Sequence, residues 1–88
     1  MELKEYILED SKGVKITGKL VKWLNEDYTL SDSPAIGKAC VVDPQLGKPR
    51  AFISEPIESF LEKSEVALKF STHSNVYTLR EYTHTLSL

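Results

Sequence analysis

The feature that most constrains the fold of this chain is an alternation of apolar and polar residues with a period of two. The clearest example is "GVKITGKL", where aliphatic residues alternate with lysine and threonine: Val14, Ile16 and Leu20 against Lys15, Thr17 and Lys19. This alternation indicates a strand with one buried face. The parity changes after Leu20, because Val21 and Trp23 fall on the lysine side. The change predicts a bulge near Gly18 or a stretch with both faces covered.

Similar apolar patterns recur along the chain and predict roughly six or seven short strands. The candidates are residues 3–9, 14–24, 28–31, 37–43, 50–54, 66–72 and 76–86, separated by turn residues. Residues 3–9 and 14–24 are expected to form a hairpin. One segment, 54–65, is a helix candidate, because Ile57, Phe60 and Leu61 have the i, i+3, i+4 spacing of a helix face and Pro56 suits a first turn.

The strand spacing predicts the fold class. We expect one compact β-rich domain over residues 1–88, either all-β or β-rich with one short helix. The short connections favour an antiparallel β-roll, barrel or sandwich over a parallel sheet. With 41% hydrophobic and 27% charged residues, the chain has the composition of a globular domain.

The compartment is inferred from the cysteine content and the first residues. Cys40 is the only cysteine, so the chain has no internal disulfide, which favours a reducing environment. The opening "MELKEYILED" is acidic where a signal peptide would be basic, and no apolar stretch is long enough to span a membrane. We expect a cytoplasmic protein with no membrane partner.

The sequence lacks a recognisable catalytic or metal-binding pattern. Cys40, His73, His84 and Asp43 have the right chemistry for nucleophilic catalysis, but no spacing links them, and burial is the preferred interpretation of Cys40. One cysteine and two distant histidines do not make a zinc site. "LGKPR" lacks the upstream glycine and the Ser or Thr of a P-loop. We therefore expect no enzymatic activity, no cofactor and no metal.

The stretch "VVDPQLGKPRAFIS" contains the densest group of candidate binding residues. Its Asp, Pro and Gly residues are typical of a turn between two strands, which leaves Lys48 and Arg50 unexplained by the turn itself. Lys and Arg can bind phosphate. Residues 43–50 are therefore a candidate loop that binds an anionic small ligand or nucleotide. In one version of this hypothesis the loop lies at a dimer interface.

Aromatic residues supply the other binding candidates. Trp23, Tyr28 and Tyr82 lie in or beside strands that also carry Lys and Arg, and exposed aromatics are frequent in protein contacts. The same combination occurs in barrels that bind single-stranded nucleic acid. The net charge of −2 and the absence of a basic stripe make nucleic acid a disfavoured partner.

The leading hypothesis is a small non-catalytic binding module that acts through protein–protein contact, such as an accessory or inhibitor protein of a bacterium or phage. The alternatives are a small-ligand or nucleotide binder using residues 43–50, and a β-barrel that binds single-stranded nucleic acid. A homodimer is also expected. The C-terminal "EYTHTLSL" is predicted either to close the fold against residues 3–9 or to pair with another copy.

Overall fold

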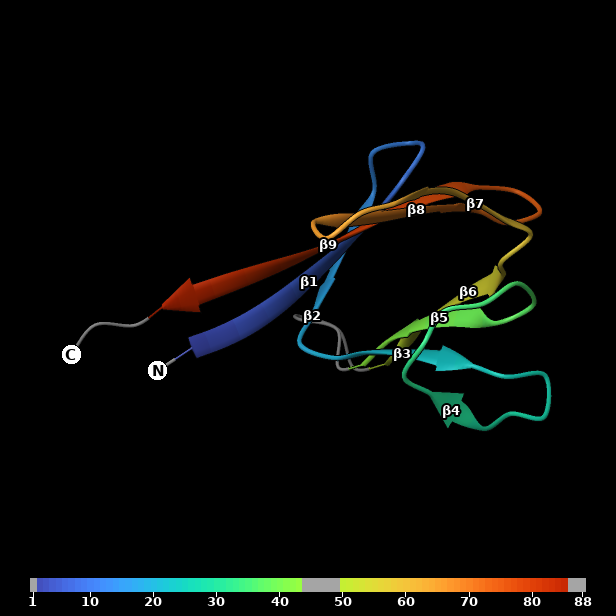
Figure 1. Cartoon of the computed structure of the whole chain (residues 1–88), viewed down its shortest axis with the longest axis horizontal. Coiled ribbons are helices and arrows are strands. Elements are labelled where there is room, and N and C mark those ends of the chain that lie inside the picture. The colour runs from blue at the N-terminus through green and yellow to red at the C-terminus, as the bar shows by residue number, and fades with distance from the viewer. Residues whose placement is uncertain (1, 44–49, 86–88) are drawn as a thin grey trace.

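A computed structural model describes residues 2–43 and 50–85, with side chains over 4–43 and 50–83. Within the described residues the fold is all-β, with nine strands and no helix, which confirms the predicted fold class (Figure 1). The strands are β1 (Glu2–Asp10), β2 (Lys15–Gly18), β3 (Val21–Leu24), β4 (Leu30–Ser31), β5 (Ala39–Val42), β6 (Phe52–Pro56), β7 (Ser59–Lys63), β8 (Ala67–Ser71) and β9 (Val76–Thr85).

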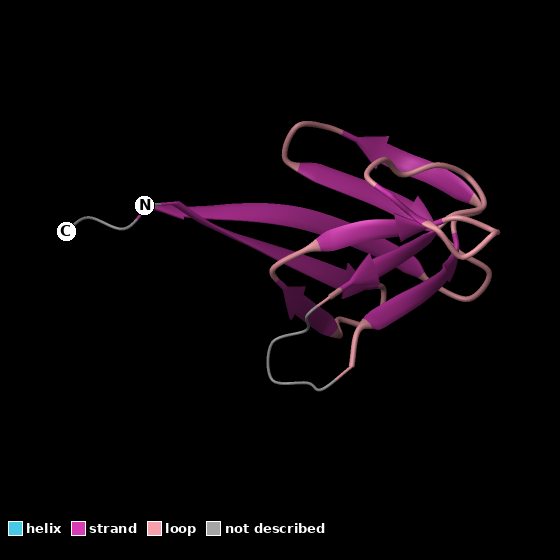
Figure 2. Ribbon diagram, turned by 90° about the horizontal axis from the view of Figure 1, so that it is seen from below, coloured by secondary structure: helices cyan, strands magenta, loops and turns pink. Residues whose placement is uncertain are grey.

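The strands form two antiparallel sheets that stack as a small sandwich (Figures 1 and 2). The five-stranded sheet has the order β2-β1-β9-β8-β7, and the four-stranded sheet has the order β4-β3-β5-β6. The chain crosses between the sheets twice, at residues 19–20 and at residues 57–58. The predicted hairpin is present, because Tyr6 to Glu9 of β1 pair with Gly18 to Lys15 of β2.

The parity change after Leu20 marks the first of these crossings. Ile16 of β2 packs on the core from the five-stranded sheet, whereas Val21 and Trp23 of β3 pack on it from the four-stranded sheet. Each strand keeps its own period of two, but the inward side chains change parity where the chain changes sheets. The segment 14–24 is therefore two strands and not one, and the predicted bulge near Gly18 is wrong, because β2 pairs with β1 without a register shift up to Gly18.

The helix candidate over residues 54–65 is not a helix, because the segment contains the end of β6, the second crossing and β7, so the all-β alternative holds. Ile57 is buried at 1% exposure, and Phe60 pairs with Phe70 and packs against the core. Leu61 lies where the β7–β8 register shifts and is 54% exposed. The three residues thus do not share one buried face, and a two-turn helix has little stability without such a face.

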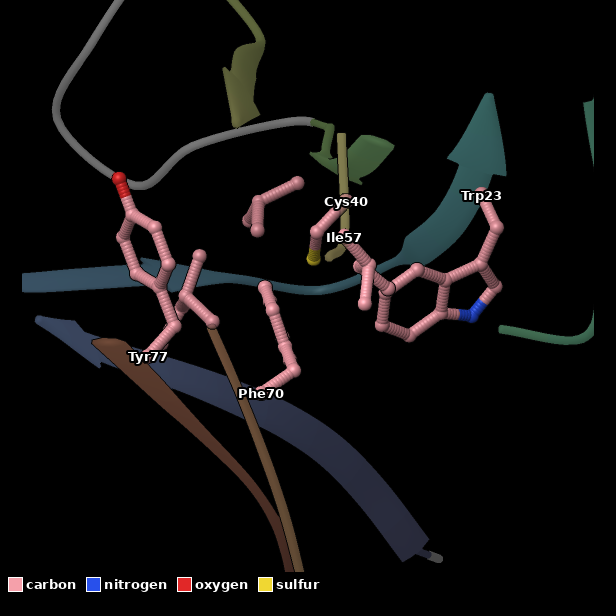
Figure 3. Packing of buried hydrophobic residues seen from close by; sticks show 7 residues of the cluster. Trp23, Cys40, Ile57, Phe70 and Tyr77 are labelled. Atoms are coloured by element: carbon pink, nitrogen blue, oxygen red, sulfur yellow. The ribbon is translucent and has the colours of Figure 1, made fainter. Parts of the chain in front are cut away.

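Seven buried residues form the core between the sheets (Figure 3): Leu8, Trp23, Cys40, Val42, Ile57, Phe70 and Tyr77. The Phe70 ring meets the Trp23 ring edge-on, with centroids 5.9 Å apart, and stacks on Tyr77 at 5.5 Å. Trp23 comes from the four-stranded sheet, while Phe70 and Tyr77 come from the five-stranded sheet. This aromatic cluster therefore joins the two layers.

A second connection between the sheets is polar. The Glu55 carboxylate, at the end of β6, accepts hydrogen bonds from the Ser74 hydroxyl, the Ser74 N–H at 3.2 Å and the Thr72 hydroxyl at 3.2 Å. Thr72 and Ser74 lie in the turn between β8 and β9 of the other sheet. The Ser74 hydroxyl bond is the largest of the effects that lower the pKa of Glu55.

We predict that Glu55→Gln removes part of the acid sensitivity of the fold. Because the pKa of Glu55 is lower in the folded chain, its stabilising contribution is present above the unfolded pKa and is lost as the pH falls through the folded pKa. The difference in free energy of unfolding between the native chain and the variant should shrink from about pH 5 down to about pH 3. Urea denaturation across that range measures it.

Glu65→Gln is the matched control, because Glu65 is exposed in the turn between β7 and β8 and its side chain has no hydrogen bond or ion pair among the described residues. This variant should keep the acid sensitivity of the native chain. Identical pH profiles for the native chain and the Glu55→Gln variant would contradict the role given to the Glu55 bridge.

Candidate functional site

The four-stranded sheet carries apolar residues on both of its faces. Trp23 of β3 and Cys40 of β5 are paired and point into the core, so their neighbours in each strand point outward. Residues directly opposite each other on paired strands lie on the same face of a sheet. The residues of β4 and β6 that pair with these outward-pointing residues therefore point outward as well. The resulting outer face consists of Lys22, Leu24, Leu30, Ala39, Val41, Ile53 and Pro56, and the Lys22 ammonium is ion-paired with Asp32.

Apart from the Lys22–Asp32 ion pair, this outer face is apolar, and it is partly open to solvent. Leu30 is 58% exposed and Ile53 is 55% exposed, while Ala39 and Val41 between them are nearly buried. A single exposed aliphatic side chain is ordinary on a protein surface, but several on one face of a sheet mark a contact surface. The outer face of the four-stranded sheet is therefore the candidate site.

The outer face of the five-stranded sheet has a different character. One row across its strands reads Lys15, Glu9, Thr78, Lys69 and Glu62 by register. Opposite charges directly across from each other, as in the Lys15–Glu9 and Lys69–Glu62 pairs, stabilise a solvated sheet face. The outer face of the five-stranded sheet thus carries a row of charged residues, whereas the outer face of the four-stranded sheet is mainly apolar.

A hollow of about 220 Å³ lies at one end of the apolar face. Its lining combines apolar residues with one acid and an exposed aromatic: Leu24, Asn25, Glu26, Tyr28, Gly37, Ala39 and Pro56. Glu26 has no ion-pair partner among the residues that the structure describes. The volume is smaller than the roughly 300–1,000 Å³ of sites for drug-sized ligands, so the hollow suits a single side chain.

Tyr28 stands at the edge of this hollow in an unfavourable backbone conformation. The turn between β3 and β4 is closed by bonds from Tyr28 N–H to Asn25 C=O at 3.0 Å and from Asn25 N–H to Thr29 C=O at 2.8 Å. Tyr28 has a φ of 66°, which favours glycine or asparagine. Its ring is 85% exposed and adds nothing to the core. Such local conflicts are concentrated at functional positions.

The other predicted contact residues lie apart from the hollow. Trp23 is 4% exposed and belongs to the core, so it offers no contact surface. Tyr82 is 42% exposed on β9 in the five-stranded sheet, and the end of β9 projects away from the turn that carries Tyr28 (Figure 1). The structure therefore does not bring the three aromatic candidates together.

The predicted hairpin around residues 43–50 is present, because Val42 of β5 pairs with Phe52 of β6. Arg50 is exposed just before β6, at the opposite end of that strand from Pro56 and the hollow. Lys48 lies outside the described residues, as do the turn positions assigned to Pro44, Gly47 and Pro49.

The residues that offer reactive chemistry do not assemble a catalytic arrangement in the described part of the chain. Cys40 is fully buried, as expected, and burial raises the pKa of its thiol to about 12, so the thiolate is scarce at neutral pH. The exposed His73 lies 3.9 Å from the Glu58 carboxylate, and the Ser74 hydroxyl bonds Glu55 and not a histidine. The side chain of His84 is outside the description.

Two kinds of feature are absent from residues 2–43 and 50–85. No group of three His, Cys, Asp or Glu side chains there could hold a metal ion. No helix there is long and apolar enough to cross a membrane. Comparison with protein-family models, curated proteins and solved structures finds no match to the chain. Its function is therefore inferred from its own surface.

The sequence did not single out Leu24, Leu30, Ile53 or Glu26, which belong to the candidate site. A usable signal was the continuous apolar run "ACVV" of β5. A strand without alternation has apolar residues on both faces, so one face serves the core and the other needs separate cover. The two-residue β4 is too short to show any period, which hides Leu30.

We predict that Tyr28→Gly raises the free energy of unfolding by roughly 0.5–1 kcal/mol. Glycine accepts a positive φ without the steric cost that a side chain pays, although its greater freedom in the unfolded chain offsets part of the gain. The contrasting variant is Tyr82→Gly, at a half-exposed tyrosine with negative φ, which should destabilise the strand. Urea denaturation measures the free energy of unfolding of both variants. An equal loss of stability in the two variants would contradict backbone strain at Tyr28.

Proposed function

We propose that this chain is a small non-catalytic binding module that holds a protein partner on the outer face of its four-stranded sheet. The observation that carries the proposal is the apolar face with its hollow beside Tyr28. Tyrosine is enriched among the residues that dominate binding energy at protein interfaces. Its ring has few rotatable bonds and is presented here from a hydrogen-bonded turn, so little freedom is lost on contact.

The lining of the hollow indicates what a partner would bring. Leu24, Ala39 and Pro56 favour an aliphatic side chain, and the unpaired Glu26 favours a nearby cation. Asp27 in the same turn accepts bonds from the Thr29 hydroxyl and N–H, which lower the pKa of its carboxyl and keep it charged. The partner segment is therefore an apolar residue flanked by Lys or Arg, and Arg can also stack on a tyrosine ring.

The alternatives have less support. The hollow beside Tyr28 is lined by Glu26 and by no Lys or Arg, which disfavours a phosphate-bearing ligand. A stacking platform for nucleic acid needs exposed aromatics side by side, whereas Trp23 is in the core and the exposed Tyr28 and Tyr82 lie apart on different sheets. A role as a bacterial or phage accessory or inhibitor protein is compatible with a contact surface of this kind and stays a prediction.

The proposal is tested by selecting phage-displayed random peptides on the immobilised chain and measuring affinity by fluorescence anisotropy with the enriched sequences. Enriched peptides should pair an aliphatic residue with Lys or Arg. Leu30→Asp should weaken their binding by about tenfold or more, because it puts a charge on the apolar face. Glu26→Gln should weaken it less, and added salt should reduce the difference between Glu26→Gln and the native chain.

Leu61→Asp is the matched control, since Leu61 is 54% exposed on the other sheet while Leu30 is 58% exposed. This control should bind the peptides as the native chain does. The proposal fails if no peptide is enriched, if both Asp variants lose binding equally, or if the enriched peptides are predominantly acidic.

A further inference from the structure

The ends of β1 and β9 form a two-stranded ribbon that projects from the sandwich (Figures 1 and 2). β9 pairs with β8 only from Val76 to Arg80, and β1 pairs with β2 only from Tyr6 to Glu9. Residues 2–5 therefore pair with residues 82–85 and with no third strand in the described part of the chain, and Glu81 pairs only with Tyr6. A two-stranded ribbon alone is marginally stable in water.

The other sheet edges carry features that discourage pairing with a further strand. β4 has two residues and β2 has four. The pairing of β6 with β5 shifts register, and β6 ends at Pro56. The pairing of β7 with β8 also shifts register, between Phe60 and Glu62. The free part of β9, residues 81–85, is longer than β2 or β4 and has no bulge or proline.

The two edges of the ribbon differ in charge. The free part of β1, residues 2–5, reads Glu-Leu-Lys-Glu and has three charged side chains in four residues. The free part of β9, residues 81–85, reads Glu-Tyr-Thr-His-Thr and has one acidic residue in five, with strand-favouring Tyr and Thr. Charges on an edge oppose pairing, so β9 offers the less protected edge.

We propose that this edge of β9 pairs with the same edge of a second copy of the chain, antiparallel and around a two-fold axis at Thr83. This register sets Thr83 against Thr83, Tyr82 against His84, and Glu81 against Thr85, with no two like charges opposed. Threonine pairs are favourable across antiparallel strands. A two-fold contact of one edge with itself closes a dimer and leaves that edge unavailable for further copies.

A second hollow supports the choice of this edge. It has a volume of about 140 Å³ and lies where the ribbon leaves the sandwich, with Glu81 of β9 and the turn before β8 in its lining. Val66 in that turn is 71% exposed, and Tyr6 and Leu79 line the same hollow. A strand added beside β9 would cover these side chains, so pairing would bury apolar surface as well as satisfy backbone groups.

Sedimentation equilibrium of the whole chain and of one edge variant, each from about 10 µM to about 1 mM, tests the proposal. The chain should approach a dimer mass as concentration rises. Thr83→Glu should shift that transition to at least about tenfold higher concentration. Lys4 lies opposite Thr83 within the ribbon and already bonds the Glu81 carboxylate at 3.3 Å, so within one chain the new carboxylate lies near this cation. At the two-fold axis, by contrast, two carboxylates meet. Thr78→Glu, in a part of β9 paired on both sides, should dimerise normally.

A cysteine cross-link tests the register. Cys40 is buried with a raised pKa, so a thiol placed by Thr83→Cys is the reactive one. Mild oxidation should link this variant into a dimer, because opposed residues of paired strands are within disulfide reach. Lys12→Cys, in the exposed turn after β1, is the control and should remain largely monomeric.

A monomeric mass for the native chain at about 1 mM would overturn the proposal, as would equal cross-linking of the two cysteine variants. A dimer that Thr83→Glu does not weaken would overturn it too, because the contact would then lie elsewhere. These outcomes are independent of peptide binding on the four-stranded sheet.

Discussion

The contact of Phe70 with Trp23 across the two sheets is the interaction on which the rest of the structure depends. Phe70 is fully buried, meets Trp23 of the opposite layer and stacks on Tyr77 of its own layer (Figure 3). Because side chains alternate along a strand, turning these rings inward decides which residues of each paired strand face outward. A slip of one residue would exchange core and surface, so this cluster fixes the register.

The consequence for function is an asymmetry between the two outer faces. With Trp23 and Cys40 inside, the four-stranded sheet is left with Leu30 and Ile53 open on its other side. The five-stranded sheet instead presents paired opposite charges. The strained Tyr28 stands beside the apolar face, where an exposed ring gains nothing from the core and is suited to contact with another molecule.

Sequence patterns predicted the class of fold well and the site only in part. "GVKITGKL" alternates clearly and locates β2, and its break in parity locates the change of sheet. Residues 54–65 could not be assigned locally, because Ile57 and Phe60 satisfy a helical spacing and the choice between helix and strand depends on the sheet that β8 provides. Tyr28 was found from its type, but burial of Trp23 and exposure of Leu30 are properties of the packed sandwich and not of local sequence.

The most direct test of the asymmetry is an NMR titration of the isotopically labelled chain with a peptide selected on it. The methyl and amide signals of Leu24, Leu30, Ala39 and Ile53 should shift on binding, together with those of Tyr28. Signals from the charged row of the five-stranded sheet, such as Lys15 and Lys69, should stay in place. Shifts centred on that row, with the four-stranded sheet unchanged, would contradict the assignment of the binding face.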